Sequence, residues 1–327
     1  MNMHRLLRAL APAAAALLLL CAGGAQAQQP AWPNKPLKLV VGFAAGSATD
    51  TAARILAERL RPVIGQQVLV ENRPGAASAI ATETVANAPA DGYTLLFSSA
   101  SATVNASAND NAGSRAYRSL APVAMVASIP NILVVHPGLG VKSVRELIAL
   151  ARSKPDALSY ASSGAGSSPH MSAELFDSRT GIKMQHVPYK GSSQAMNDVL
   201  PGLVPVMFSP ASSVLGYIKA GKLVALATTS NRRTSLLDVP TLEETGVPDF
   251  NISLWFGVLA PKGTDPAVVR SLAAAIDKAL DDPEARALLA KQTMEVVKAG
   301  PAEFGEFITS EIARWGALIK ANHIAIN

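Results

Sequence analysis

Two loops rich in small and hydroxyl-bearing residues have the composition and spacing of anion-binding loops. One runs from Gly42 to Asp50 and the other from Ser162 to His170, and each joins a predicted strand to a predicted helix. Small side chains let the backbone approach a ligand closely, and the free amides at a helix N-terminus favour an anion such as a carboxylate. Either loop alone is also compatible with a capped turn that binds nothing. As a pair, they predict two anion-binding loops that face each other across a cleft.

Two further segments place polar side chains after predicted strands. Residues 99–105 are expected to form a polar loop, with an ordinary surface loop as the alternative. Residues 187–192 offer Tyr189 as a hydrogen-bond donor and Lys190 as a cation, although a lysine is more often a solvated surface charge. Both segments are secondary candidates for ligand contacts.

The sequence lacks the common catalytic motifs. The loop at 42–50 has neither the lysine of a nucleotide-binding P-loop nor Gly-x-Gly-x-x-Gly spacing. There is no Gly-x-Ser-x-Gly nucleophile elbow, and no His-x-x-x-His pair or clustered carboxylates to hold a metal. His170 is expected to hold its loop rather than to act as a base. We therefore expect no catalytic residues, no metal and no cofactor.

The first 27 residues have the three parts of a secretory signal peptide. Arg5 and Arg8 precede an apolar run too short to span a bilayer, and residues 25–27 form a small-x-small cleavage site. We expect cleavage after Ala27 and a periplasmic protein. A retained membrane anchor and lipidation at Cys21 are the alternatives. Because Cys21 is the only cysteine, cleavage leaves no disulfide, thiolate nucleophile or cysteine metal site.

The composition is that of a globular protein with a large core. The chain has 327 residues, of which 49% are hydrophobic and 16% charged, enough for two domains or one large one. The net charge of +5 is small, and no helix shows a cluster of lysine and arginine on one face. We therefore expect no nucleic-acid partner.

Strands and helices are predicted to alternate along the chain. The expected elements of the first part are strand 37–43, helix 50–61 capped by Thr49, strand 67–71, helix 77–87 and strand 93–98. After an apolar segment at 123–135 they are helix 144–152, strand 158–162, helix 169–179, strand 183–187, helix 193–200, strand 204–208, helix 214–220 and strand 223–228. A further apolar strand at 251–260 and amphipathic helices at 265–281 and 302–321 complete the chain.

The alternation along the chain predicts an α/β fold, and its first part, residues 37–98, predicts a mostly parallel sheet covered by helices. The apolar segments 123–135 and 251–260 bracket a self-contained α/β block. We therefore expect a discontinuous first domain, residues 28–127 plus 251–327, and a second domain, residues 128–250, after the signal peptide at 1–27.

Nine blocks of the sequence, in order, resemble the periplasmic solute-binding proteins of the tripartite tricarboxylate transporter family, the Bug receptors. The blocks lie at Trp32–Pro36, Phe43–Arg54, Glu71–Ala76, Asp91–Thr94, Tyr160–His170, Val187–Gly191, Lys219–Leu223, Val239–Gly246 and Trp255–Pro261. The resemblance implies a fold like that of type II periplasmic binding proteins, with two α/β domains joined by two crossing segments. It further implies a receptor, expected to be monomeric, that closes on a small carboxylated solute and delivers it to a two-component membrane carrier.

The resemblance also implies which residues contact the ligand. The residues carried over by motif match are Phe43, Ala45, Ser47, Thr49 and Asp50 on one side, and Ser163, Gly166, Ser167, His170 and Tyr189 on the other. Ser101, Thr103 and Asn105 match the family more loosely, and Ser209 occupies a further ligand-site position.

The chain departs from the family pattern at three places. Gly46-Ser47 stands where two glycines are usual, and Ala165 replaces a residue that is often polar. Pro205 and Ser209 stand where the family usually has aspartates. Losing the acid at Ser209 removes a partner for a ligand ammonium, which predicts that the ligand is not an amino acid.

Two other functions are compatible with the residues. One is a periplasmic sensor of the same fold whose closed form docks a histidine kinase. The other is a hydrolase that uses Ser167 and His170 as nucleophile and base.

Overall fold

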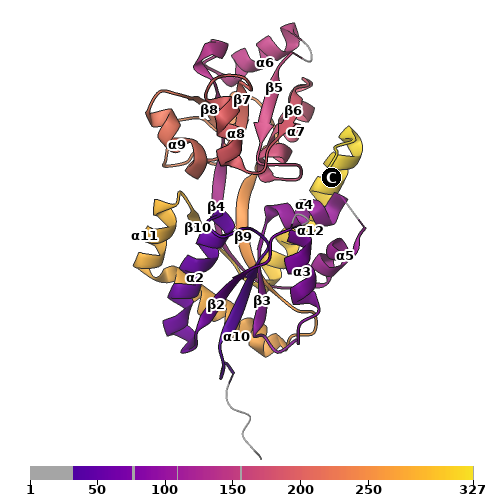
Figure 1. The fold of residues 1–327 in the computed structure, drawn as a ribbon, viewed down its shortest axis with the longest axis vertical. Helices are drawn as coiled ribbons and strands as arrows, with labels where there is room; N and C mark the ends of the chain where they lie inside the picture. The colour runs from indigo at the N-terminus through magenta and orange to yellow at the C-terminus, as the bar shows by residue number, and fades with distance from the viewer. Residues whose placement is uncertain (1–31, 76–77, 109, 155–156, 327) are drawn as a thin grey trace, which may run out of the picture. The chain divides into compact units, whose positions relative to one another are not determined.

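The computed structural model describes residues 32–75, 78–108, 110–154 and 157–326 (Figure 1). The predicted signal peptide, its cleavage site and Cys21 lie outside these residues. Residues from Lys35 onward form one unit, to which the following description applies. None of the helices within the described ranges is long and apolar enough to cross a membrane.

Three parallel strands form the first part of the sheet. They are β1 (Leu37–Val41), β2 (Val68–Asn72) and β3 (Thr94–Ser99), with β1 in the middle. The helices between and after them are α2 (Ala48–Ile64), α3 (Ala79–Ala86), α4 (Ala100–Ala108) and α5 (Ala112–Ser119). Because β1 pairs on both edges and is covered by helices, almost all its side chains are buried, as its continuous apolar sequence predicts.

A second group of parallel strands follows the same plan. Strand β5 (Ser159–Ser162) lies between β6 (Gln185–Pro188) and β7 (Val206–Pro210), while β8 (Val224–Thr228) pairs with β4. The helices of this group are α6 (Val144–Ser153), α7 (Ser168–Thr180), α8 (Ser192–Val199) and α9 (Ala211–Lys219). Short 3-10 turns occur at Pro137–Leu139 and Glu243–Thr245.

Two long antiparallel strands connect the groups, β4 (Ala121–Val135) and β9 (Ser253–Ala260) (Figure 1). The first ten residues of β4 pair with β9, and its last five pair with β7 and β8. The strand order is β2-β1-β3-β9-β4-β7-β5-β6. The mostly parallel sheet predicted for residues 37–98 is confirmed by the parallel pairs of β1 with β2 and β3, whereas β4 and β9 join the two groups by antiparallel pairing.

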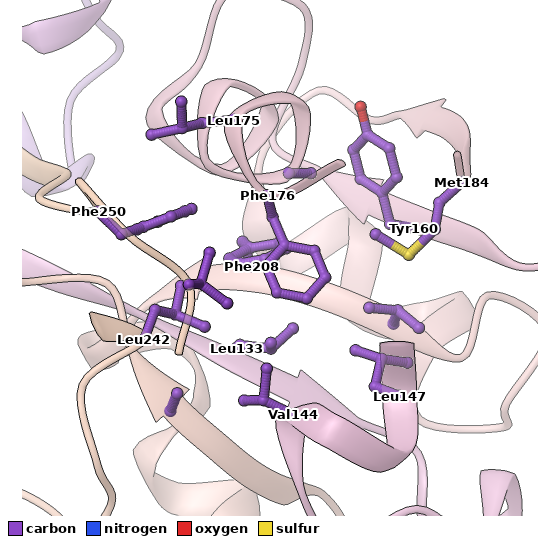
Figure 2. Close-up of a cluster of buried hydrophobic side chains, with 14 of the residues drawn as sticks. Leu133, Val144, Leu147, Tyr160, Leu175, Phe176, Met184, Phe208, Leu242 and Phe250 are labelled. Atoms are coloured by element: carbon purple, nitrogen blue, oxygen red, sulfur yellow. The ribbon is translucent and has the colours of Figure 1, made fainter. Parts of the chain in front are cut away.

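The C-terminal part returns to the first group. It comprises α10 (Pro266–Asp281), α11 (Pro283–Lys291), β10 (Glu295–Ala299) and α12 (Pro301–Asn322), and β10 pairs antiparallel with β4. Helix α12 contributes Phe304 and Ile308 to one hydrophobic cluster, and Trp315 and Leu318 to another. This second cluster, shown in Figure 2, includes Phe208 of β7 and gathers side chains of the second group.

Several local predictions need correction. Residues 99–105 are mostly helical rather than a loop, since α4 begins at Ala100 and the Thr103 hydroxyl donates to the Ala100 carbonyl. Helix α2 is capped by Ser47, whose Oγ accepts from the Asp50 amide, and not by Thr49. Helices α5 and α11 and strand β10 were not predicted.

Gly257 of β9 allows a close approach of Phe304, and its substitution should destabilise the fold. A Cβ there would lie 2.3 Å from Phe304 Cζ and 3.0 Å from the Ala124 carbonyl oxygen. We predict that Gly257→Ala lowers the free energy of unfolding by about 1–3 kcal/mol, the usual cost of overpacking. Urea denaturation measures this. Gly216→Ala in α9, where a Cβ meets nothing within 4 Å, is the matched control and should be neutral or stabilising. An equal loss in both variants would contradict the packing argument.

Candidate ligand-binding cleft

Five helices begin beside the carboxyl ends of parallel strands, and their first turns line one cleft of about 620 Å³. The helices are α2, α4, α7, α8 and α9, which contribute Ala48, Ser101, Ser168, Ser192 and Ser212 respectively. Each N-terminus carries a partial positive charge and amides without intrahelical partners. Their convergence makes the cleft attractive to an anion.

Side chains in the cleft add hydroxyl groups and one cation. The lining hydroxyls are those of Ser47, Thr49, Thr51, Ser99, Ser101, Ser163, Ser167, Ser168, Ser192, Ser193, Ser212 and Ser213. Lys190 is the one charged side chain among the described lining residues, and no aspartate or glutamate is among them. The Ser99 hydroxyl is buried and has no hydrogen-bond partner in the described structure, so a bound acceptor or donor would satisfy it. Phe43, Leu254 and Met294 supply apolar surface.

A carboxylate holds the first loop in shape. Gly46, at φ +81°, donates its amide to Asp50 Oδ2 at 2.8 Å, and Asn72 Nδ2 donates to Asp50 Oδ1 at 2.8 Å. Arg54 Nε donates to the same carboxylate at 2.9 Å. Burial alone would raise the pKa of Asp50, but these hydrogen bonds, that from Arg54 foremost, hold the pKa below its usual range. Asp50 is thus ionised at neutral pH and supports the loop from behind.

An imidazole holds the second loop in the same way. Gly166, at φ +70°, donates its amide to His170 Nδ1 at 3.0 Å, again four residues later. Ser167 Oγ accepts from the His170 amide at 3.4 Å and caps α7, as Ser47 caps α2. The prediction that His170 holds its loop is confirmed by this contact.

Behind the second loop lies a cluster of buried and partly buried ionisable groups. The rings of His170 and His186 stack with centroids 4.0 Å apart, and His186 Nε2 lies 2.7 Å from Ser162 Oγ. Glu174 accepts from Tyr160 OH at 2.6 Å and lies 3.6 Å from His170 Nε2. Burial, reinforced by His170, lowers the pKa of His186 to about 4, so this ring is neutral at neutral pH.

Glu174 and Asp177, on one face of α7, differ in charge. Burial opposes ionisation of Glu174, but hydrogen bonds from His170 and Tyr160 keep its pKa below its usual value. Burial raises the pKa of Asp177 to about 8, although its Oδ2 accepts from the Met184 amide at 2.7 Å. Glu174 is therefore anionic at neutral pH, while Asp177 is mainly a neutral acid.

Comparison with known proteins shows the family of this chain. The sequence profile described as "Tripartite tricarboxylate transporter family receptor" (TctC) matches residues 52–324. The chain belongs to this family. It is 39% identical over 324 residues to the protein BugT of Bordetella pertussis, covering 98% of both chains.

Solved structures of family members superpose on the chain. A protein of R. palustris solved with adipate has 35% identity and a TM-score of 0.79, covering 90% of this chain and 99% of that one. MatC of Rhodopseudomonas palustris, with bound malate, has 28% identity and a TM-score of 0.76, covering 88% and 100%. These likenesses confirm the predicted family and its α/β periplasmic-binding-protein fold.

The structure places some of the predicted ligand residues on the cleft surface and others beside it. Those that line the cleft are Phe43, Ser47, Thr49, Ser101, Ser163 and Ser167. Gly166 belongs to the second loop but does not line the cleft, Asp50 and His170 hold the two loops from the first turns of α2 and α7, and Ala45 is an exposed residue of the first loop. Their roles toward a ligand stay predictions.

The remaining predicted residues lie away from the lining. Thr103 and Asn105 are buried in α4, and Tyr189 OH donates to Asp198 at 2.6 Å. Ser209 is buried in β7, and its hydroxyl has no partner within the described ranges. Contact with a ligand at these positions also stays a prediction.

Sequence reasoning missed the polar start of α9, and at the start of α8 it included Ser192 only as the last residue of the candidate segment 187–192. Ser192, Ser193, Ser212 and Ser213 all line the cleft. The rule applied to the first two loops, a helix that begins directly after a parallel strand, would have found them. Lys190, judged more typical of a solvated surface charge, is exposed but lines the same cleft.

The geometry gives no support to a serine nucleophile. His170 Nδ1 accepts from Gly166 and its Nε2 faces Glu174, so neither ring nitrogen is directed at Ser167. Ser162 does contact His186, but its side chain is fully buried and does not line the cleft. No group of three metal-ligating side chains occurs in the part of the chain that the structure describes.

The neutral acid at Asp177 predicts a pH-dependent stability. Its native pKa of about 8 lies above its usual value near 4, so the native state holds a proton that the unfolded chain releases. The stabilisation is complete below about pH 4 and is lost as the pH rises toward 8. We predict that Asp177→Asn melts near the wild-type temperature at pH 5 but about 2 °C or more above it at pH 8.

Asp238→Asn is the matched control for this measurement, because the Asp238 side chain is fully exposed. Its difference from wild type should not change between pH 5 and pH 8. A difference for Asp177→Asn that is equally pH-independent would show that the buried carboxyl does not hold a proton.

Proposed function

We propose that this protein is an extracytoplasmic receptor that captures a small carboxylated solute in the cleft and delivers it to a two-component carrier of the tripartite tricarboxylate type. One observation carries the proposal: five helix N-termini and twelve hydroxyls line a cleft with one cation and no acid among the described residues. The family description supports the transport role, and the ligands of two relatives, adipate and malate, support the carboxylate class.

The capping geometry supports capture of a carboxylate by backbone amides. Ser47 accepts from the Asp50 amide through its side chain and from the Thr51 amide through its carbonyl. The preceding amides, of Ala48 and Thr49, are too early in α2 to have intrahelical acceptors. A carboxylate in the cleft would provide acceptors for amides of this kind at several helices at once.

The charge of the cleft supports a dicarboxylate rather than an amino acid. A ligand ammonium would need a carboxylate or several acceptors, and the lining offers no acidic side chain in the described ranges. The buried Ser209 stands where the family usually has an acid. Lys190 lines the cleft and has no ion pair with any of the described residues, which supports it as a partner for a second carboxylate.

We further propose that binding closes two domains, residues 28–127 plus 251–327 and residues 128–250, about β4 and β9. Closure would desolvate the ligand and strengthen each hydrogen bond to it. A receptor with this role works as a monomer in the periplasm, after removal of residues 1–27.

A thermal-shift comparison of matched acids tests the ligand class. Malate carries a hydroxyl group where aspartate carries an ammonium group. Comparing the two therefore distinguishes a carboxylate receptor from an amino-acid receptor. We predict that a C4–C6 dicarboxylate such as malate, succinate or adipate raises the melting temperature, because a ligand that binds only the native state stabilises it. Aspartate and glutamate should give no shift. A shift with aspartate that exceeds the shift with malate would contradict the proposal.

Lys190 should matter for the second carboxylate only. We predict that Lys190→Met weakens dicarboxylate binding by about tenfold, the worth of one charge-assisted contact, and changes monocarboxylate binding by less than about twofold. Calorimetric titration measures both. Lys219→Met, at the far end of α9, is the matched control and should leave both affinities unchanged. Equal losses for both ligand classes would place Lys190 outside the second-carboxylate site.

A further inference from the structure

A buried chain of hydrogen bonds runs from the crossing strand β4 to the cleft. Asn131 of β4 is fully buried, and its Nδ2 donates to Ser168 Oγ at 2.7 Å and to Ser172 Oγ at 3.0 Å. Ser168 is the first residue of α7 and lines the cleft, whereas Ser172 lies one turn further along α7 and does not. The chain therefore joins β4 to the start of a helix that faces the cleft.

The hydroxyl of Ser172 determines which way the Asn131 amide faces. Ser172 Oγ donates its single proton to the Ser168 carbonyl oxygen at 2.8 Å, so toward Asn131 it can only accept. The Asn131 atom that faces the two serines is therefore the Nδ2 donor. The opposite orientation would also leave two N–H groups buried without an acceptor, because the Oδ1 position has no hydrogen-bond partner in the described structure.

This orientation makes the Ser168 hydroxyl a donor toward the cleft. Its oxygen accepts from Asn131, and no hydrogen bond takes up its own proton among the described residues. The backbone amide of Ser168 is likewise too early in α7 to have an intrahelical acceptor. Ser168 thus offers two donors on one residue of the lining, which favours an acceptor such as a carboxylate oxygen over a donor such as an ammonium.

The backbone of Asn131 is itself fixed by both crossing segments. Its amide donates to Thr229 Oγ1 at 3.1 Å, and its carbonyl accepts from the Thr229 amide at 3.0 Å. Thr229 Oγ1 in turn donates to the carbonyl of Ile252, just before β9, at 2.6 Å. The Asn131 side chain therefore reaches Ser168 from a fixed point, so the hydroxyl is oriented before a ligand arrives.

We propose that Ser168 contacts the ligand and that Asn131 is a positioning residue, which fixes the Ser168 hydroxyl as a donor and so selects a carboxylate oxygen at this point of the cleft. This inference rests on the proposed function. It adds to the backbone amides of the helix starts one oriented side-chain donor, and it assigns a binding role to a residue of β4 that does not line the cleft.

Ser168→Ala tests the contact with the ligand. The loss of a hydrogen bond to a charged group weakens binding by about tenfold or more. We expect that loss for succinate and for adipate, measured by calorimetric titration at pH 8, where both carboxylates of each ligand are ionised. Melting curves of the unliganded variants show that each one folds.

A double-mutant cycle tests the positioning role of Asn131. Asn131→Leu keeps the volume of the side chain but lets the Ser168 hydroxyl rotate, which should weaken binding by about fivefold, the cost of immobilising one side-chain group. In the Ser168→Ala background the same substitution should change affinity by less than about twofold, because the hydroxyl that it orients is gone. A purely structural role would give an equal loss in both backgrounds.

Ser143→Ala is the matched control. Ser143 is also a serine at a helix start, where it caps α6 by accepting from the Glu146 amide, but it does not line the cleft. This variant should melt at a lower temperature than wild type and bind with unchanged affinity.

The outcomes distinguish this inference from the proposed function. If the wild-type protein binds neither succinate, malate nor adipate, the proposed function fails and this inference fails with it. If the wild-type protein binds and Ser168→Ala changes the affinity by less than about twofold, only this inference is overturned. An equal loss for Asn131→Leu in both backgrounds would overturn the positioning role. Ser168→Ala decides the ligand contact even if Asn131→Leu does not fold.

Discussion

A hydrogen bond from a glycine amide to the side chain four residues later shapes both loops that line the cleft. Gly46 and Gly166 adopt the left-handed conformation, which costs a glycine little and most other residues much. The acceptors, Asp50 and His170, lie in the first turn of the helix that follows. Each bond therefore ties a loop to its own helix and fixes the direction in which the helix N-terminus faces.

The rest of the fold brings these helix starts together. Strands β4 and β9 pass from one group of parallel strands to the other, and β4 pairs with members of both. All five helices that line the cleft begin after a strand whose carboxyl end faces it. Since helix dipoles and unpaired amides are properties of the backbone, the cleft can attract an anion although its described lining holds no arginine and a single lysine.

The sequence predicts well what depends on short-range patterns. The apolar run at Leu37–Val41 identifies β1, and the small residues before α2 and α7 identify the two loops. The sequence predicts poorly the segments whose structure depends on contacts between residues far apart in the chain. Residues 100–108 mix serine, threonine and asparagine, which favour turns, with alanines, which favour a helix, and the segment is helical and largely buried. Strand β10 exists because it pairs with β4, far away in the chain, and the contact between Ser162 and His186 joins two neighbouring strands.

The central claim is that backbone amides at helix starts, rather than a charged side chain, hold the ligand carboxylate. A crystal structure of the protein with bound malate or adipate tests it most directly. The account predicts that the oxygens of one carboxylate accept hydrogen bonds from amides in the first turns of α2 and α7, with hydroxyls such as those of Ser47 and Ser167 nearby. A carboxylate held instead by the Lys190 ammonium alone, with these amides left to solvent, would contradict it.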